Sequence, residues 1–534
     1  MTQPDQLKSA EPLQWSPGRG IDVWAMISAA IAGDLDAIRE LVERDPSLVR
    51  SHYGYRKPLY FAVRENSVAV ARFLLERDPD PFGLAVNDSL LEIARDRGYM
   101  ELEALIDDAS RRLCGATPEG NPVCDALRER DLERAGALVD ESPALLHTGD
   151  RTSNQPIHWA VMTRNIDAID AMLARGADIN ARRKDGARPI HLSNGDYNYR
   201  GWRDVPKDVD TTPAEVLDHL IAKGAYVDIW TASHRGDVER LRQLLDEEPS
   251  LANRNSDYRS YYLGSGSALR NAAAKGHIAL VRLLLDRGAD PNLPEEYIAP
   301  HGHALYSAVY SGHHDIARLL LAHGAIPNVE VESSADTLSI AISNNDAEMV
   351  ELLCSHGAAR RLHLLAYYGD VQTAAAMLAA KSELADDVEA LSNAAGCGRE
   401  SFVRLMLRYR PRLAERLSMN GGKTPEMARL LQAHGWDPNR ADWLGITPLH
   451  ECARRGNVER AALLLDLGAN LEARDEDICS RPLAWAAKFG QLAMVEFLLT
   501  RGAQLEAVDD PPWATPLEWA LRRGHSEVAG ILGK

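Results

Sequence analysis

Cysteine is scarce in this chain of 534 residues, and long hydrophobic runs are absent. The six cysteines are widely spaced and none belongs to a Cys-x-x-Cys pair, which argues against a disulfide framework or a zinc site and favours free thiols in a reducing compartment. No apolar run reaches the roughly 18 residues of a transmembrane helix, and residues 1–20 lack the apolar core of a signal peptide. The sequence therefore predicts a cytoplasmic protein.

Positive charge is in deficit, with 60 Lys and Arg against 78 Asp and Glu and a net charge of −18. This balance argues against nucleic acid or an anionic membrane as a partner. Catalytic motifs are missing as well: there is no Gly-x-Ser-x-Gly, no Gly-x-x-x-x-Gly-Lys-Ser/Thr, no His-Glu-x-x-His and no dinucleotide fingerprint, and no cofactor is predicted. The 45% of hydrophobic residues nevertheless excludes a disordered chain.

What the sequence does contain is a repeated pattern, clearest between Thr447 and Asn470. Thr447 and Pro448 are typical of a helix start, because threonine caps free N–H groups there and proline has none to lose. Gly456 then marks a tight turn, and Gly468 ends a second helix where a left-handed residue is preferred. A helix pair this short cannot bury its apolar faces alone, so it must stack on similar units.

The 20-residue spacing from Pro448 to Gly468 recurs through the chain, for example from Pro156 to Gly176. Residues 1–22 are predicted to form a polar leader and residues 23–534 a single solenoid. Placing every helix pair in this register gives sixteen units, which start near Ala25, Pro58, Leu90, Pro122, Pro156, Pro189, Asp228, Ala268, Ala304, Thr337, Arg361, Ala390, Glu415, Pro448, Pro482 and Pro516.

Thr-Pro-Leu-His, a Gly-polar turn and a Gly-Ala-Asn exit together resemble the ankyrin-repeat family, and the resemblance covers about nine-tenths of the chain. It implies an all-α ankyrin-repeat solenoid of helix-turn-helix units linked by short β-hairpin fingers. It also implies that His158, His191 and His450 hold neighbouring units together, and that the fingers and the exposed ends of the first helices line a concave binding surface.

Departures from the repeat length are concentrated in units six to nine, where long loops cover residues 194–211, 253–266 and 293–303. Insertions in a solenoid collect on one face and often form its binding surface. Three connections are instead too short for a finger, and we expect possible bends of the solenoid at these points, near 224–228, 357–361 and 410–415.

The long loops are rich in Tyr and Trp interleaved with Arg, the composition of a binding hot spot. The same rings would serve equally to pack the loops on one another. The predicted ligand- or partner-binding residues in and beside these loops are Tyr197, Tyr199, Arg200, Trp202, Tyr258, Arg259, Tyr261, Tyr262, Tyr297 and Tyr310.

The family's concave surface, carried over to later units, adds further binding candidates at the ends of first helices. Its C-terminal part is basic and would favour an acidic partner there, although such residues are also typical of ordinary solvated helix ends. These candidates are Tyr367, Arg454, Arg455, Lys488 and Phe489, with Arg522 and Arg523 in the same basic patch.

The leading hypothesis is an intracellular binding protein that holds a protein, a peptide or a small polar ligand in a concave groove centred on units five to nine. The alternative is a solenoid enzyme that acts on a sugar-like or other polar substrate at a site built by the long loops. A lone His-x-His is a weak metal signal, so no metal site is predicted. The acid and base candidates of the enzyme hypothesis are Asp196, Asp257, Glu295, Glu296, His301 and His303.

Overall fold

The computed structural model describes the chain except residues 14–15, 79–87, 115–116, 151–152, 184, 195–208, 259–261, 294–302, 329–335, 418–421, 423, 509 and 534. The described residues form helices, turns and three isolated β-bridges, Pro12 with Arg19, Tyr53 with Arg56 and Asn255 with Ser267. The predicted all-α solenoid of sixteen helix pairs is confirmed. The fingers in the described part are turns and bridges, without an extended strand.

Each unit consists of a first and a second helix. The first helices are α1 (Gly20–Ala32), α3 (Pro58–Arg64), α5 (Leu90–Asp96), α7 (Asn121–Arg128), α9 (Pro156–Met162), η5 (Pro189–Leu192), α12 (Ile229–Arg235), α14 (Ala268–Ala274), α16 (Ala304–Tyr310), α18 (Thr337–Ser343), α20 (Leu362–Tyr368), α22 (Val388–Gly396), η8 (Leu413–Arg416), α25 (Pro448–Arg455), α27 (Pro482–Lys488) and α29 (Pro516–Arg522). In units six and thirteen the first helix is reduced to a short 3-10 helix.

The second helices are α2 (Leu35–Arg44), α4 (Val68–Arg77), α6 (Met100–Cys114), α8 (Leu132–Glu141), α10 (Ile166–Ala174), α11 (Pro213–Ala222), α13 (Val238–Glu247), α15 (Ile278–Asp286), α17 (His314–Ala322), α19 (Ala347–Ser355), α21 (Val371–Ala380), α23 (Glu400–Tyr409), α24 (Pro425–Ala433), α26 (Val458–Asp466), α28 (Leu492–Thr500) and α30 (Ser526–Leu532). Short 3-10 helices lie between them at η1 (Asp5–Lys8), η2 (Pro46–Arg50), η3 (Pro118–Gly120), η4 (Pro143–His147), η6 (Pro249–Asn253), η7 (Ser382–Ala385) and η9 (Pro512–Ala514).

Local interactions explain where these helices begin. A short polar residue caps many second helices; the Asp237 carboxylate, for example, accepts the N–H of Arg240 at 3.0 Å. In units five and fourteen a buried histidine of the first helix, His158 or His450, joins the unit to the next finger. His158 accepts the N–H of Gln155 at Nδ1, 3.0 Å away, and its Nε2–H donates to the carbonyl of Ala181 at 3.1 Å. The stack is therefore tied together at every such histidine by bonds that require the neutral ring.

This arrangement predicts acid sensitivity. Burial lowers the pKa of His158 to about 3 from its ordinary 6.5. Because the unfolded chain binds a proton below about 6.5 and the folded chain does not, the stability that His158 contributes is complete above that pH and is lost progressively toward about pH 3. We expect the urea midpoint to fall between neutral pH and about pH 5.

The matched variant is His158→Gln, which keeps a donor and an acceptor but cannot be protonated. Carboxylates and other buried histidines still contribute to the pH dependence. The urea midpoint of the variant should therefore decrease less steeply with falling pH than that of the parent. If the urea midpoint depends on pH equally in parent and variant, His158 does not contribute to the acid sensitivity.

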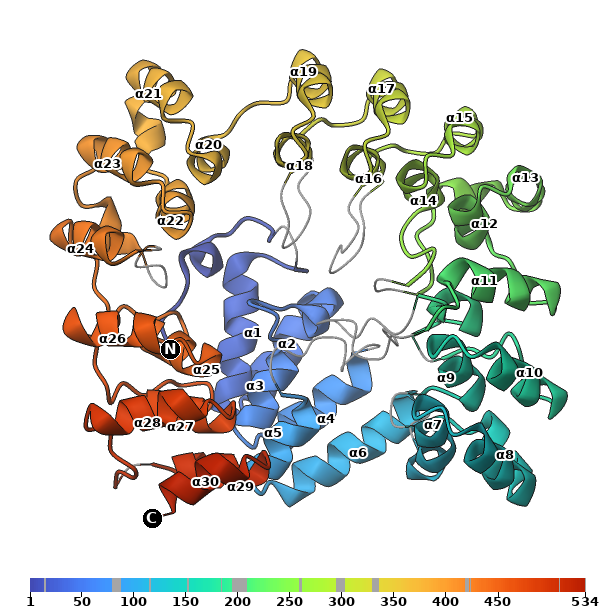
Figure 1. The fold of residues 1–534 in the computed structure, drawn as a ribbon, viewed down its shortest axis with the longest axis horizontal. Helices are drawn as coiled ribbons and strands as arrows, with labels where there is room; N and C mark the ends of the chain where they lie inside the picture. The colour runs from blue at the N-terminus through green and yellow to red at the C-terminus, as the bar shows by residue number, and fades with distance from the viewer. Residues whose placement is uncertain are drawn as a thin grey trace.

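The units follow a ring (Figure 1), with the first helices from α12 to α22 on its inner side and their second helices on the outer rim. The helices α1, α3 and α5 lie inside this ring against α25 to α30, and α6 extends from them toward α7, so units one to three meet units fourteen to sixteen. One hydrophobic core accordingly contains buried residues from Leu7 to Ala109 together with others from Leu362 to Leu532. A second core runs from Val123 to Leu364.

Candidate functional site

Most of the predicted loop residues lie outside the described part of the chain. These are Asp196, Tyr197, Tyr199, Arg200, Trp202, Arg259, Tyr261, Glu295, Glu296, Tyr297 and His301. The described members of the cluster are Asp257, Tyr258, Tyr262, His303 and Tyr310. Their surroundings show how the loop region of units six to nine is built.

Tyr258 and Tyr262 are buried, with 1% and 5% of their surface exposed. The Tyr258 ring stacks on His191 at 3.7 Å between centroids. The Tyr262 hydroxyl donates to the Asp185 carboxylate at 3.0 Å and accepts from Arg183 at 2.9 Å. Both tyrosines thus fasten the loop 253–266 to unit six, and neither is available to a partner in this structure.

This loop reaches unit six because the finger before unit seven is missing. Only a short turn separates Gly224 from the start of α12 at Ile229. Across the gap, the N–H of Leu263 donates to the carbonyl of His191 at 3.0 Å. A Cβ at Gly186 would lie 2.8 Å from the carbonyl oxygen of Asp257, so the two fingers touch directly. The lengthened loop therefore compensates for the shortened connection beside it.

A pocket of about 320 Å³ remains beneath this bridge, between the fingers and the end of α13. Its floor contains His191, whose Nε2 lies 2.9 Å from a carboxylate oxygen of Asp228. The other oxygen of Asp228 accepts the N–H of Thr231 at 2.8 Å. Burial alone would raise the pKa of Asp228, but His191 and the hydrogen bonds from Thr231 together outweigh burial and the pKa is lowered. The floor is a rigid, hydrogen-bonded pair.

Tyr226, which is 42% exposed, also lines the pocket. The guanidinium groups of Arg188 and Arg240 lie 4.6 and 5.4 Å from the centre of its ring. Asp257, one of the enzyme-hypothesis residues, also lines this pocket. His303, another, immediately precedes α16 in unit nine, and burial lowers its pKa.

Two other predicted tyrosines are exposed at the ends of inner helices. Tyr310 ends α16 and is 65% exposed, and Tyr367 in α20 is 51% exposed. Each is backed by a second ring: Tyr306 stacks on Tyr310 with centroids 6.3 Å apart, and Tyr368 meets Tyr367 edge-on at 5.1 Å. The exposed rings are thereby held in place before any partner arrives.

At the C-terminal end the basic residues are already engaged within the chain. Arg454 and Arg455 pair with Glu451 on their own helix, at 2.9 and 3.2 Å. Phe489 packs against Trp485, with ring centroids 6.1 Å apart. These contacts are local and leave Arg455 exposed.

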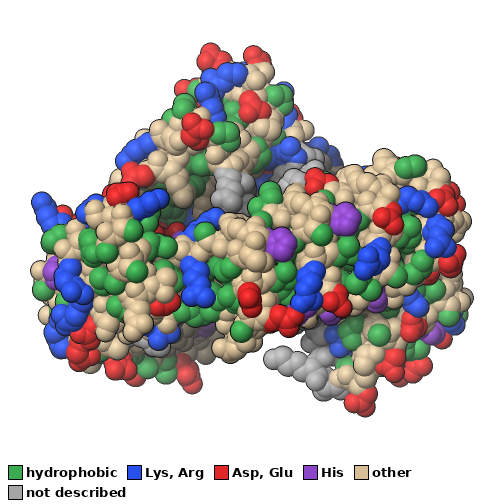
Figure 2. Space-filling view, turned by 90° about the horizontal axis from the view of Figure 1, so that it is seen from above, with side chains coloured by type: hydrophobic (Ala, Val, Ile, Leu, Met, Phe, Trp, Pro, Cys, Tyr) green, Lys and Arg blue, Asp and Glu red, His purple; other side chains and the backbone are tan. Residues whose placement is uncertain are grey.

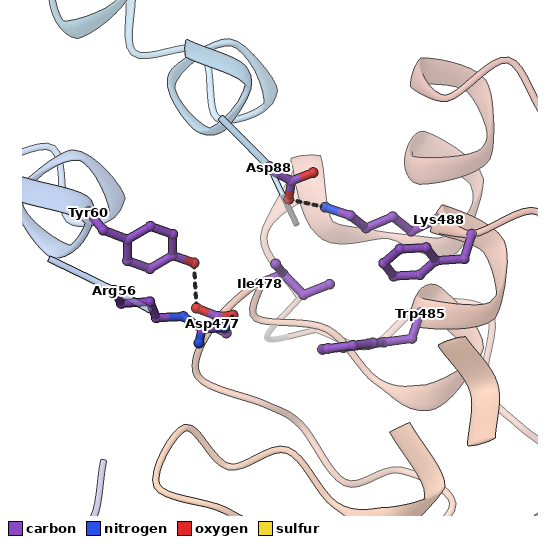
Figure 3. Close-up of a pocket in the computed structure, with 8 residues that line it drawn as sticks. Arg56, Tyr60, Asp88, Asp477, Ile478, Trp485 and Lys488 are labelled. Atoms are coloured by element: carbon purple, nitrogen blue, oxygen red, sulfur yellow. Dashed lines mark hydrogen bonds and ion pairs between the residues drawn. The ribbon is translucent and has the colours of Figure 1, made fainter. Parts of the chain in front are cut away.

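The remaining basic residues meet unit three. Lys488 is 4% exposed and pairs with Asp88, which lies just before α5 (Figure 3). Arg523 pairs with Asp88 at 3.1 Å and with Asp96 at 2.7 Å. The acidic groups that the sequence led us to expect opposite these units belong, in this structure, to the chain's own N-terminal part.

Two fingers complete this contact between the ends of the chain, here called the closure interface. The Asp477 carboxylate lies between Arg56 and Tyr60, accepting a hydrogen bond of 2.6 Å from each (Figure 3). Trp443 packs edge-on against Tyr53, with centroids 5.3 Å apart. Burial would raise the pKa of Asp477, but the charge of Arg56 and the bonds to both partners lower it.

Sequence reasoning missed the closure interface. The repeat register locates each finger within its own unit but does not say which distant unit it meets. One signal was present: the acidic finger Asp475-Glu476-Asp477 stands among C-terminal helix ends that are basic. Such a finger is complementary to an arginine-bearing surface, here that of Arg56.

Other classes of site find no support in the part of the chain that the structure describes. No group of three or more His, Cys, Asp or Glu side chains there could hold a metal ion. None of the helices described is both long and apolar enough to cross a membrane. On the face seen in Figure 2, basic and acidic side chains are interspersed rather than gathered by sign.

Comparison with known proteins agrees with this architecture. Family models described as ankyrin repeats match residues 415–510 and 269–321, and the model of a single ankyrin repeat matches residues 154–184. The two core regions of the molecule each contain at least one of these matches.

Individual relatives match over part of the chain. A rice protein named "Probable E3 ubiquitin-protein ligase XBOS32" is 30% identical over 174 residues, which are 32% of this chain and 26% of the relative. Mouse "Protein phosphatase 1 regulatory subunit 27" is 25% identical over 103 residues, 18% of this chain and 67% of the relative. Mouse "Palmitoyltransferase ZDHHC13" is 24% identical over 139 residues, 26% of this chain and 22% of the relative.

The chain thus spans about a quarter of the length of the rice ligase and of the palmitoyltransferase that it matches. Recurring helix pairs, the histidine ties between units and the three matching segments lead to one conclusion: the chain is an ankyrin-repeat protein.

Proposed function

We propose that this protein is a binding protein that holds a partner protein or peptide along the inner wall of its ring, in a groove centred on units five to nine and extending to unit eleven. Ankyrin repeats are protein-interaction modules, and solenoids bind on extended concave surfaces. The observation that carries the proposal is the pair of exposed but ring-supported tyrosines, Tyr310 and Tyr367, on inner helices.

Exposed aromatic side chains of this kind are typical binding anchors, because they offer large area with little loss of conformational freedom. The C-terminal units have no such role in the proposal, since the closure interface occupies Lys488 and Arg523. The pocket of units six to eight lies toward the other end of the same wall. A mouse relative is by its name a regulatory subunit of a phosphatase, which is consistent with a binding role for the repeats.

Single replacement of Tyr310 or Tyr367 by alanine should weaken partner binding while leaving the fold intact, because both side chains are more than half exposed. The measurement is a selection of random displayed peptides on the full chain, followed by titration of the selected peptides against each variant. Loss of a binding anchor costs about 2 kcal/mol or more, equivalent to about 30-fold in Kd.

The control is Leu521→Ala, which removes a 56% exposed apolar side chain from α29, outside the proposed groove. Unchanged binding by both tyrosine variants, or no peptide selected on the parent protein, would exclude the proposed function.

A further inference from the structure

The pocket at the missing finger is bordered by three arginines that have no carboxylate partner among the residues that the structure describes. Arg182 and Arg188 line the pocket, and Arg240 lies beside it over Tyr226. Two of the three are fixed in position. Arg240 donates to the carbonyl of Val227 at 3.0 Å, and Arg188 stacks on the Tyr226 ring.

Such a group of arginines around one ring contrasts with the outer rim of this acidic chain. On the outer rim, arginines before the exit glycines pair with aspartates of the preceding unit: Arg175 with Asp140 at 2.8 Å, and Arg287 with Asp246 at 2.7 Å. With 78 acidic residues against 60 basic ones, partners are abundant. Arg182, Arg188 and Arg240 have no such ion pair among the described residues, so their positive charge remains available to an incoming group.

The pocket's own carboxylates define what that group can be. Asp228 is bonded to His191, and Glu248 pairs with Arg254 at 3.1 Å. Glu247 and Asp257 also line the pocket as hydrogen-bond acceptors, and one oxygen of Glu247 already accepts from Gln243 at 2.9 Å. The carboxylates of Glu247 and Asp257 would repel a doubly charged phosphate. A single carboxylate flanked by peptide N–H groups, in contrast, can pair with the arginines while the N–H groups donate to Glu247 and Asp257.

We propose that this pocket receives an acidic side chain, Asp or Glu, of a bound polypeptide. Its carboxylate meets the guanidinium groups of Arg182 and Arg188, and N–H groups of the same segment meet Glu247 and Asp257. This assignment rests on the proposed binding function and names the chemistry of the partner. The partner segment would then bind where the finger before unit seven is missing.

The test uses the full chain and random displayed peptides as the probe. Selected peptides should be enriched in Asp or Glu. Exchange of that residue for Asn or Gln should weaken binding about 10-fold, as should the double variant Arg182→Glu with Arg188→Glu, and binding of the parent should weaken as salt is raised.

The matched control is the double variant Arg404→Glu with Arg408→Glu, the same charge change at two exposed arginines of α23 far along the ring. A milder double variant, Arg182→Gln with Arg188→Gln, covers the case in which charge reversal disturbs folding, which thermal unfolding monitors. Selected peptides without acidic enrichment, or with equal affinity for parent and arginine variants, would overturn this inference. If such peptides nevertheless bind the Tyr310→Ala variant more weakly, the proposed function stands without this inference. If no peptide is selected at all, the proposed function and this inference are both overturned.

Discussion

Asp477→Ala is expected to lower the free energy of unfolding by about 3–5 kcal/mol, because it leaves the Arg56 guanidinium buried without its partner. The two side chains are 3% and 8% exposed and meet at 2.6 Å. Tyr60 loses the acceptor of its hydroxyl in the same variant. Urea unfolding followed by circular dichroism measures the loss, and hydrogen exchange in units one and two locates it.

The matched comparison is Asp466→Ala, which removes an exposed carboxylate paired with Arg501 on the outer rim. Exposed pairs contribute about 0–1 kcal/mol, so this variant should unfold nearly as the parent does. The double variant Arg56→Met with Asp477→Leu should recover much of the loss, since apolar side chains of similar volume replace a buried ion pair at little cost. Similar losses for Asp477→Ala and Asp466→Ala would contradict the burial argument.

Lys488→Glu is expected to open the closure interface at its other end. The new carboxylate would face Asp88 across a contact in which the lysine side chain is only 3% exposed. Juxtaposed like charges in such a place cost several kcal/mol. Small-angle scattering should show a larger radius of gyration, because units one to three would no longer be held against units fourteen to sixteen.

Lys488→Met provides the comparison, because it removes the charge, whose Nζ lies 3.9 Å from the centre of the Trp519 ring, and retains an apolar side chain of similar length. Asp88 keeps Arg523 as a partner, so this variant should cost about 1–3 kcal/mol and leave the ring closed. Introducing Asp88→Lys into Lys488→Glu restores an opposite-charge pair and should reduce the radius again. A compact Lys488→Glu protein would show that the hydrophobic part of the interface is sufficient for closure.

These variants matter for function because the closure interface uses the surface on which ankyrin repeats bind partners. The fingers that carry Trp443 and Asp477, and the helix end that carries Lys488, hold the chain's own N-terminal units. Recognition of an external partner is therefore proposed for the opposite part of the ring, where Tyr310 and Tyr226 are exposed.

The sequence by itself determined the repeat. Helix starts at Pro156, Pro448 and Pro482 were predicted without error, because proline, capping side chains and glycine act within a few residues of themselves. The histidine ties are readable for the same reason: His450 bonds to Thr447 in its own unit and to Ser480 in the next finger. The sequence also located the shortened connection near residues 224–228 and the lengthened loop 253–266, but it did not show that the two lie together.

Tertiary structure decided which of these features face a partner. Tyr258 and Tyr262 belong to a residue type that is common in binding hot spots. In the structure they are buried, and they hold the loop 253–266 against unit six where the finger before unit seven is missing. Lys488 looked like an exposed helix end and is the buried partner of a residue 400 positions away. The physical reason is that the rotations of successive units add up along the chain. Each unit adds a small rotation to the solenoid, so the distance between its ends depends on the sum over all sixteen units and on every missing finger. Local residue patterns determine each unit, whereas only the assembled ring brings Arg56 to Asp477.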